Sequence, residues 1–231
     1  MKGRLYGVGV GPGDPELLTL KALRIIKEAD VIACPGEDPK ESVAYAIVLK
    51  AYPELENKEL LGVPMPMTKD KKVLEENHAK GARLLAEFLE QGKNIAFLTL
   101  GDTTVYSTYI YVHEKILEMG YEAEIVSGIT SFCAASAAFN MGLVEKDEEL
   151  HIIPASYQIE EALKLPGTKV LMKAGKKMGQ VKEILKKTDA EVFMIENCGM
   201  EGEKIYKGAE NIPENAGYYS LIIVKEKYPS G

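Results

Sequence analysis

The sequence predicts an α/β fold of two units, the first built on a mostly parallel sheet and the second on a mixed sheet. In the first half, apolar strand-like runs alternate with amphipathic segments, which is typical of parallel strands joined by helices. In the second half, strand-like runs dominate, and the last two leave no room for a helix between them. The 231 residues suit one large domain or two small ones. We place the boundary near Gly128, giving an N-terminal α/β domain over 1–127 and a C-terminal one over 128–231.

Composition excludes several classes of protein. Hydrophobic residues make up 46% of the chain and charged residues 27%, which is typical of a globular domain, and the net charge of −7 disfavours a general nucleic-acid binder. Cys34, Cys133 and Cys198 are too sparse for a disulfide framework or a zinc pair. The N-terminus lacks a signal-peptide pattern and the small, apolar run 129–141 is too short to cross a bilayer, so we expect a cytoplasmic protein.

The elements of the first half follow from apolar periodicity and from helix-capping residues. The run 5–10 is a strand that ends in the tight turn GPGD. Asp14 is a good N-cap and Pro15 suits a first helical position, so a helix is predicted from there to Ala29. By the same criteria we expect, in order, a strand at 31–34, helix 42–51, strand 60–63, helix 72–91, strand 94–100, a helix from the turn 101–104 through 119, strand 123–126 and an alanine-rich helix after 128.

The second half is predicted mainly from short apolar runs. Its expected strands are 150–153, 168–172, 191–195, 203–206 and 219–225. Its expected helices are 159–165 and 178–187. No internal repeat and no low-complexity segment is present.

A glycine-rich loop, Gly7–Asp14, lies between the first strand and the first helix. It is either a ligand cradle, since glycines let a ligand approach the backbone, or a bare tight turn. The dinucleotide fingerprint G-x-G-x-x-G fails, because Pro12, Asp14 or Glu16 takes the last glycine position in each possible register. A G-K-[ST] motif is absent as well. The loop therefore favours a ligand without phosphate.

Two further loops lie at corresponding positions. Leu100–Thr108 follows the strongest predicted strand, and Ser127–Ser131 follows the next one. Open α/β sheets bind ligands at the carboxyl ends of their strands. Taken singly, Asp102 or Thr104 is equally well explained as a helix N-cap. Taken together, the polar residues of the two loops favour a binding site.

The three loops resemble the tetrapyrrole (corrin/porphyrin) methylase family. The matching motifs are VGVGPGDPELLT at 8–19, LGDTTVYST at 100–108 and SGITSF at 127–132, with weaker matches at 171–173 and 195–199. The family usually has proline where this chain has Thr103. Within the family, the GDxTVYST form and the chain length most resemble enzymes that methylate carbon 20 of precorrin-2 or cobalt-factor II in cobalamin biosynthesis.

The resemblance implies a homodimer whose subunits each hold S-adenosylmethionine in a cleft between two α/β domains, with S-adenosylhomocysteine as product. Such a sulfonium cofactor suits apolar side chains, hydroxyls and backbone groups. The cofactor-binding residues that the resemblance implies are Pro12, Leu100, Gly101, Asp102, Val105, Thr130, Ser131, Met172, Asn197 and Ser220.

The reaction implied is transfer of a methyl group to an electron-rich ring carbon, which afterwards loses a proton. Asp102 and Tyr106 are candidates for the base or for orienting the substrate, although a structural role explains Asp102 at least as well. Thr103, Tyr106 and Lys176 are candidate substrate contacts, with a solvated face as the alternative for Lys176. The histidines, which lack partner carboxylates in the sequence pattern, are interpreted as structural or surface residues, and no protein metal site is expected; they are His78, His113 and His151.

Several alternatives remain at this point. The same fold could serve methylation at another tetrapyrrole position or of RNA or protein, though the acidic balance argues against RNA. A non-catalytic nucleotide-sensing module is a second alternative, and a nicotinamide dehydrogenase is disfavoured by the broken fingerprint. The sequence leaves open whether the tetrapyrrole carries cobalt.

Overall fold

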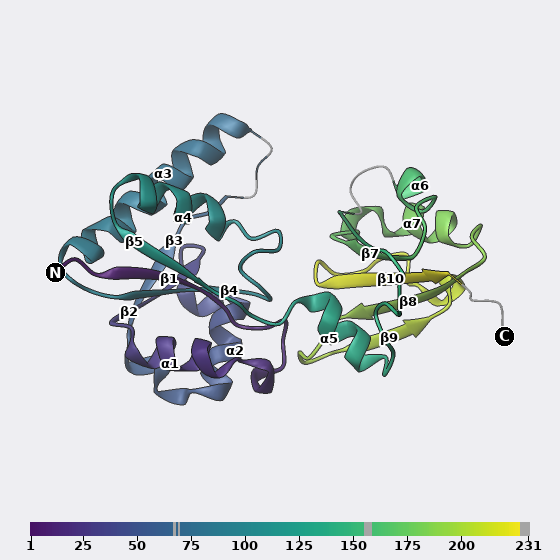
Figure 1. Cartoon of the computed structure of the whole chain (residues 1–231), viewed down its shortest axis with the longest axis horizontal. Helices are drawn as coiled ribbons and strands as arrows, with labels where there is room; N and C mark the ends of the chain where they lie inside the picture. The colour runs from purple at the N-terminus through teal and green to yellow at the C-terminus, as the bar shows by residue number, and fades with distance from the viewer. Residues whose placement is uncertain (67, 69, 155–158, 227–231) are drawn as a thin grey trace. The chain divides into compact units, whose positions relative to one another are not determined.

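The computed structural model describes residues 1–231 except 67, 69, 155–158 and 227–231; the side chain of Lys176 is also outside the described part. The chain divides into two compact units, Met1–Thr130 and Ser131–Gly231. Each unit holds one five-stranded sheet with helices (Figure 1). The predicted fold class, with a mostly parallel first sheet and a mixed second sheet, is confirmed.

The first unit is built on a parallel sheet with the strand order β3-β2-β4-β1-β5. From β1 the chain passes β4 to reach β2, and from β4 it passes β1 to reach β5, so the direction of winding changes between β1 and β4. In open α/β sheets such a switch point is where ligands bind. The strands are β1 (Arg4–Gly9), β2 (Val31–Pro35), β3 (Glu59–Val63), β4 (Ile95–Thr99) and β5 (Glu122–Val126).

Helices cover both faces of this sheet. Figure 1 shows α1 and α2 on one face and α3 and α4 on the other. Each pair packs on its own apolar layer: Val8 and Leu98 belong to the layer under α1 and α2, and Leu5 and Phe97 to the layer under α3 and α4. Burial of such side chains contributes about 1.5–3 kcal/mol each. The helices are α1 (Leu20–Glu28), α2 (Val43–Ala51), α3 (Lys71–Glu90) and α4 (Tyr109–Glu118).

The helix predicted from Asp14 to Ala29 is wrong at its start. Asp14 and Pro15 do begin a helical turn, but it is the short 3-10 helix η1 (Pro15–Leu17). Leu18 is then extended, and the hydroxyl of Thr19 accepts a hydrogen bond from the amide of Ala22 at 3.1 Å, which begins α1 anew. A second good N-cap four residues after the proline divides the predicted helix.

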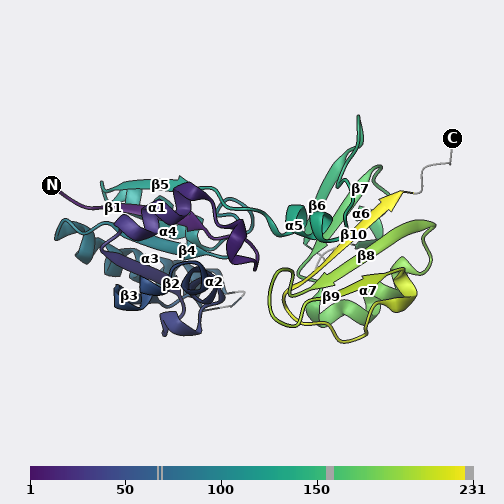
Figure 2. The ribbon, with the colours of Figure 1, turned by 90° about the horizontal axis from the view of Figure 1, so that it is seen from below.

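The second unit contains a mixed sheet with the order β6-β7-β10-β8-β9, in which only β6 and β7 pair in parallel. All five predicted strands are present. The 12 residues that link the last two strands, β9 and β10, contain no α-helix, as expected, but they do contain the short 3-10 helix η5 (Ala209–Asn211). In the sheet, β8 lies between these two strands (Figure 2). The strands are β6 (Leu150–Pro154), β7 (Thr168–Met172), β8 (Ala190–Glu196), β9 (Lys204–Lys207) and β10 (Ser220–Glu226).

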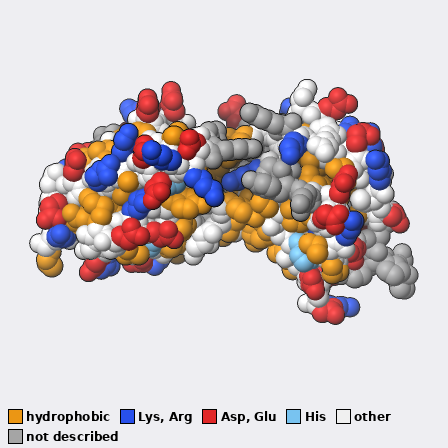
Figure 3. Space-filling view, turned by 90° about the horizontal axis from the view of Figure 1, so that it is seen from above, with side chains coloured by type: hydrophobic (Ala, Val, Ile, Leu, Met, Phe, Trp, Pro, Cys, Tyr) orange, Lys and Arg blue, Asp and Glu red, His pale blue; other side chains and the backbone are white. Residues whose placement is uncertain are grey.

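The helices of the second unit are shorter than those of the first. They are α5 (Ser131–Ala138), α6 (Ile159–Ala162) and α7 (Met178–Leu185). The further 3-10 helices of the chain are η2 (Pro39–Glu41), η3 (Pro53–Asn57), η4 (Gly175–Lys177) and η5 (Ala209–Asn211). Within the described residues, no helix combines the length and apolar composition that crossing a bilayer requires. Acidic and basic side chains are interspersed over the face drawn in Figure 3.

Candidate functional site

The first two glycine loops meet where the central strands β1 and β4 end. Gly9 and Thr99 are partners in the strand register, and the amide of Val10 donates to the carbonyl of Thr99 at 2.9 Å. Beyond the strands, Gly11 and Gly101 exchange two backbone hydrogen bonds, of 3.1 and 2.8 Å. Both have positive φ, 80° and 72°, so these positions favour glycine. The two loops are therefore joined by their backbones at the switch point of the sheet.

The third loop packs directly on the other two. A Cβ atom at Gly128 would lie 2.2 Å from the carbonyl oxygen of Gly101 and 2.7 Å from the carbonyl carbon of Gly9. A Cβ atom at Gly9 would lie 2.6 Å from the amide nitrogen of Gly128. Backbone approaches this close require glycine. The structure thus brings together, within the first unit, the three loops that the sequence motifs singled out.

Asp102 joins the second loop to the third. Its side chain is buried, and one oxygen, Oδ1, accepts from the Thr104 amide at 2.8 Å and from the Thr104 hydroxyl at 2.5 Å. The other oxygen, Oδ2, accepts from the Gly128 amide at 2.8 Å. Since α4 begins only at Tyr109, the prediction of a helix starting from 101–104 is wrong, and neither Asp102 nor Thr104 caps it.

Thr103 lies beneath the loop instead of facing a ligand. Its side chain is fully buried, and its hydroxyl donates to the carbonyls of Val126 at 3.2 Å and Gly7 at 3.4 Å. These bonds fasten the second loop across the carboxyl ends of β1 and β5. Because the Thr103 hydroxyl already donates to two backbone carbonyls, we leave Thr103 out of the proposed substrate contacts.

Tyr109, which the sequence analysis did not single out, is buried against Gly7 of β1. A Cβ atom at Gly7 would lie 2.0 Å from its ring, so the missing side chain at Gly7 makes room for it. The Tyr109 hydroxyl lies 3.0 Å from Nδ1 of His113. Burial raises the pKa of Tyr109 and lowers the pKa of His113, which favours the neutral form of both. The signal in the sequence for this contact is Gly7, a glycine inside a predicted strand, which leaves space for a bulky side chain.

The middle of the second loop is exposed. Tyr106 is 45% exposed and has a φ of 51°, a left-handed conformation that is uncommon for a bulky residue. Thr104 is exposed and Val105 is partly buried beside it. Non-glycine residues in such conformations cluster at functional sites. Of the two residues predicted to act as base or substrate-orienting group, Tyr106 is therefore the accessible one.

Two hydroxyls near the loops are buried without a hydrogen-bond partner in the described part of the chain. They are Oγ1 of Thr99, at the end of β4, and Oγ1 of Thr130, in the third loop. Buried polar groups normally have a partner, which can be a bound molecule or water. The pair thus fits a ligand that carries hydrogen-bonding atoms. Pro12 is buried within the first loop, and Leu100 packs against the core beneath α1 and α2.

The predicted cofactor residues of the second unit gather at one end of its sheet. Met172 ends β7, Ser220 begins β10, and Asn197 follows the last residue of β8. Since β10 pairs with both β7 and β8, the three positions are neighbours. Asn197 has a φ of 53°, and its backbone amide donates to the backbone carbonyl of Tyr219 at 2.9 Å. Ser131 is the first residue of α5, and the Lys176 side chain lies outside the described residues.

The histidines contribute nothing to these loops directly. His78 on α3 is buried and stacks on Tyr111 of α4, with ring centroids 4.8 Å apart. The prediction that no histidine has a carboxylate partner is wrong for His151, whose Nε2 lies 3.1 Å from Oε2 of Glu149. Among the residues that the structure describes, no three side chains of His, Cys, Asp or Glu are grouped as a metal site would require.

These features define a class of protein: an α/β protein whose three glycine-containing loops meet at the carboxyl edge of a parallel sheet, without the phosphate-binding motifs. Residues 4–211 match the family described as Tetrapyrrole (Corrin/Porphyrin) Methylases. The chain belongs to this family, as the three motifs predicted.

Relatives of known name support the assignment along the whole chain. The probable cobalt-precorrin-2 C(20)-methyltransferase of Methanocaldococcus jannaschii is 38% identical, over 96% of each chain. The precorrin-2 C(20)-methyltransferase of a Sinorhizobium species is 29% identical, over 96% of this chain and 95% of that one. The solved uroporphyrin-III C-methyl transferase of Thermus thermophilus complexed with S-adenyl homocysteine has the same fold, with a TM-score of 0.71, 24% identity and 96% and 92% coverage.

Proposed function

We propose that this chain transfers a methyl group from S-adenosylmethionine to carbon 20 of precorrin-2 or cobalt-factor II, a step of cobalamin biosynthesis. Family membership and the full-length similarity to two proteins with C(20)-methyltransferase names support the proposal. The structural observation that supports it is the close approach of three glycine backbones, at Gly9, Gly101 and Gly128.

The residues of the loops fit this cofactor. S-adenosylmethionine is a sulfonium ion without phosphate, and the loops offer backbone groups, apolar side chains and hydroxyls. The buried hydroxyls of Thr99 and Thr130 lack partners among the described residues, and the cofactor has the amine, carboxylate and hydroxyl groups to bind them. When bound, it supplies an activated methyl group. The residues of the three loops proposed to hold it are Pro12, Leu100, Gly101, Asp102, Val105, Thr130 and Ser131; for Asp102 the proposed contact is through its backbone, since both side-chain oxygens are bonded within the protein.

The second-unit residues Met172, Asn197 and Ser220 are kept as proposed cofactor contacts because of the family resemblance. Their gathering at one end of the second sheet is consistent with a shared role. The test is the dissociation constant of S-adenosylmethionine for Met172→Ala, with Met178→Leu in α7, a volume-conserving change in the core, as control. A constant unchanged in Met172→Ala would remove that residue from the proposal.

The task of these residues is alignment. Holding the two reactants in line can contribute up to about 7–11 kcal/mol to lowering a bimolecular barrier. The acceptor carbon must also lose a proton. The exposed Tyr106 is the residue that we propose to orient the substrate or to receive that proton, directly or through water.

The direct test is incubation with methyl-labelled S-adenosylmethionine and either metal-free or cobalt-loaded substrate, followed by mass and NMR analysis. We expect one added methyl group, with the label at carbon 20, and the preferred substrate identifies the metal requirement. Label at another ring carbon would support the methyltransferase activity but would contradict carbon 20 as the methylated position. No transfer to either tetrapyrrole would reject the function.

Substrate carboxylates require positive charge, and Lys176 remains the proposed contact. We expect Lys176→Glu to raise the KM of the tetrapyrrole about tenfold, the order expected for loss of one charged contact, while the affinity for S-adenosylmethionine is unchanged. Lys187→Glu, beyond the end of α7, is the matched control. Equal weakening of both ligands by Lys176→Glu would contradict the assignment.

The expected homodimer and cytoplasmic location are further parts of the proposal. Light scattering on the purified protein tests the first, and fractionation of the source cells tests the second.

A further inference from the structure

Asp102 makes three hydrogen bonds that lead to two different loops. Oδ1 accepts twice from Thr104, within the second loop, and Oδ2 accepts from the amide of Gly128, in the third loop. Gly128 is 26 residues further along the chain. The side chain is buried, with an exposed fraction of 8%. Each carboxylate oxygen is therefore already engaged by the protein.

This arrangement differs from that of a proton acceptor. A general base must present a lone pair within hydrogen-bond reach of the proton that it removes. Three of the roughly four lone-pair sites of the Asp102 carboxylate accept hydrogen bonds within the protein, and the side chain is buried. The Asp102 carboxylate, which accepts from two amides and one hydroxyl of the loops, has the contacts of a structural acceptor.

The position of Gly128 explains what the carboxylate holds. Its backbone lies against Gly9 and Gly101 so closely that a Cβ atom would meet the Gly101 carbonyl at 2.2 Å. These contacts are between backbone atoms of three glycines, and the van der Waals attraction between so few atoms is small. A charge-assisted hydrogen bond to the Gly128 amide is a strong contact that can keep the third loop in place.

From these contacts we infer that Asp102 is a positioning residue that clamps the third loop, including Thr130, to the second loop, and that it has no role in proton transfer. The inference rests on the proposed function where it concerns cofactor binding. The clamp itself is a statement about the free protein, and it is testable without any ligand.

The first experiment is hydrogen–deuterium exchange on the ligand-free protein, comparing wild type with Asp102→Asn. The asparagine oxygen can still accept from Thr104, but its NH₂ group then faces the Gly128 amide, so only the bond between the loops is lost. We expect exchange in the peptide 127–132 to accelerate roughly tenfold to hundredfold, the factor for losing one buried hydrogen bond to a charged acceptor. Unchanged exchange in this peptide would overturn the inference.

A matched control comes from Asp38, whose Oδ1 accepts from the amide two residues on, Lys40, at 2.9 Å, as Asp102 does from Thr104. Asp38→Asn keeps that turn and touches none of the three loops, so exchange in 127–132 is expected to match wild type. Asp102→Ser is the second variant in case Asp102→Asn does not fold. Its hydroxyl is too short to span both loops, so the same acceleration is expected.

The second experiment separates positioning from proton transfer. For Asp102→Asn we expect the dissociation constant of S-adenosylmethionine to rise roughly tenfold to hundredfold, and the pH profile of kcat to keep its wild-type midpoint. Lost turnover with unchanged cofactor affinity and a changed pH profile would overturn the inference in favour of a base. If the wild-type chain transfers no methyl group, the proposed function fails, while exchange in the free protein still decides the clamp.

Discussion

At the scale of single residues, the site depends on side chains that are absent. Gly9, Gly101 and Gly128 let three backbones approach to distances that no Cβ atom permits. All three glycines stand in sequence motifs that predicted a binding site, yet the sequence cannot show which glycine approaches which. That information depends on the packing of segments about 90 and 120 residues apart.

Gly128→Ala tests this packing. The new Cβ atom would meet backbone atoms of Gly101 and Gly9, which cannot rotate away. We expect a loss of about 1–3 kcal/mol in the free energy of unfolding, the usual range for overpacking, measured by urea denaturation. Gly179→Ala in α7 is the control, because a Cβ atom there meets nothing within 4 Å. Since alanine favours helix, the control is expected to stabilise the protein slightly, by up to about 1 kcal/mol.

Thr103 offers a second test at this scale. Its hydroxyl ties the second loop to the carbonyls of Gly7 and Val126, bonds that a proline at this position could not form. Thr103→Val keeps the shape and removes the donor, so we expect a loss of about 1–3 kcal/mol in the free energy of unfolding. Thr103→Ser should retain most of the stability. Equal stability of the valine variant and wild type would show that the two bonds do not hold the loop.

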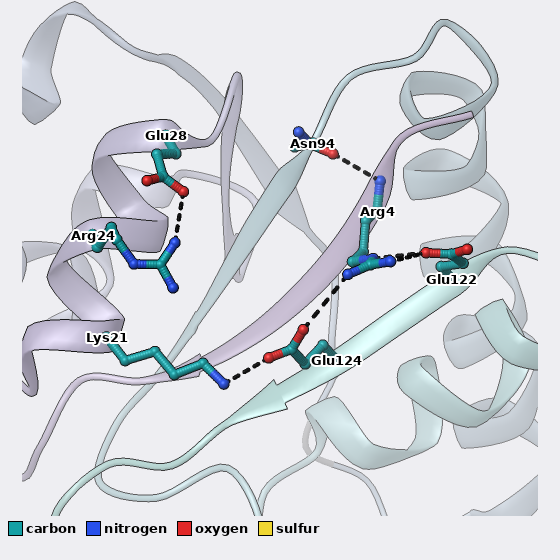
Figure 4. A network of polar contacts seen from close by, with 7 residues as sticks. All are labelled: Arg4, Lys21, Arg24, Glu28, Asn94, Glu122 and Glu124. Atoms are coloured by element: carbon teal, nitrogen blue, oxygen red, sulfur yellow. Dashed lines mark hydrogen bonds and ion pairs between the residues drawn. The ribbon is translucent and has the colours of Figure 1, made fainter. Parts of the chain in front are cut away.

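At the scale of elements, an ion-pair network joins β1, β5 and α1 (Figure 4). Arg4 on β1 pairs with Glu122 and Glu124 of the edge strand β5, and Lys21 on α1 pairs with Glu124 at 2.6 Å. Charged side chains on an edge strand also disfavour pairing with another chain. The hydrogen bond from Lys21, followed by the charges of Lys21, Arg4 and Arg24, lowers the pKa of Glu124 below its ordinary value of 4.5.

The direction of this shift predicts an acid dependence. Because the pKa of Glu124 is lower in the folded state, its stabilisation is present above pH 4.5 and is lost as pH falls through the folded value. We expect Glu124→Gln to destabilise the protein at neutral pH by about 0.2–1 kcal/mol, as for exposed pairs, and to weaken the loss of stability on acidification. Both effects should shrink at 1 M salt, where screening is strong. An unchanged acid dependence in urea titrations would contradict the assignment.

Element boundaries show where prediction from sequence ends. Strands form where the sequence has short apolar runs, because a strand that is buried in a sheet needs apolar side chains whatever its neighbours are. The predicted starts of α1 and α4 are wrong. Thr19, not Asp14, caps α1, and the side chain of Asp102 holds residues 102–104 in a turn, so that α4 begins only at Tyr109. Residue preferences identify the residues that can begin a helix. Which of them does so also depends on hydrogen bonds to distant residues, such as that between Asp102 and Gly128.

At the scale of the whole molecule, the alternation of strands and helices was enough to predict an α/β fold with one parallel and one mixed sheet. The strand orders were not predictable, because they depend on pairings between distant segments. The order β3-β2-β4-β1-β5 is nevertheless what places the switch point beside the first two loops. The family resemblance supplied the proposed ligand, and the broken phosphate-binding motifs agree with a ligand without phosphate. The geometry of the first unit adds that the three loops meet at the carboxyl ends of its strands.

The most direct test of this account is calorimetric titration of the purified chain with S-adenosylmethionine and, separately, with NAD. We predict saturable binding of S-adenosylmethionine and no binding of NAD. In Gly128→Ala the affinity for S-adenosylmethionine should fall at least tenfold, which corresponds to about 1.4 kcal/mol of overpacking strain in the bound state. Binding of NAD without binding of S-adenosylmethionine would contradict the central claim. Wild-type affinity for S-adenosylmethionine in a folded Gly128→Ala variant would show that the ligand binds away from the three loops.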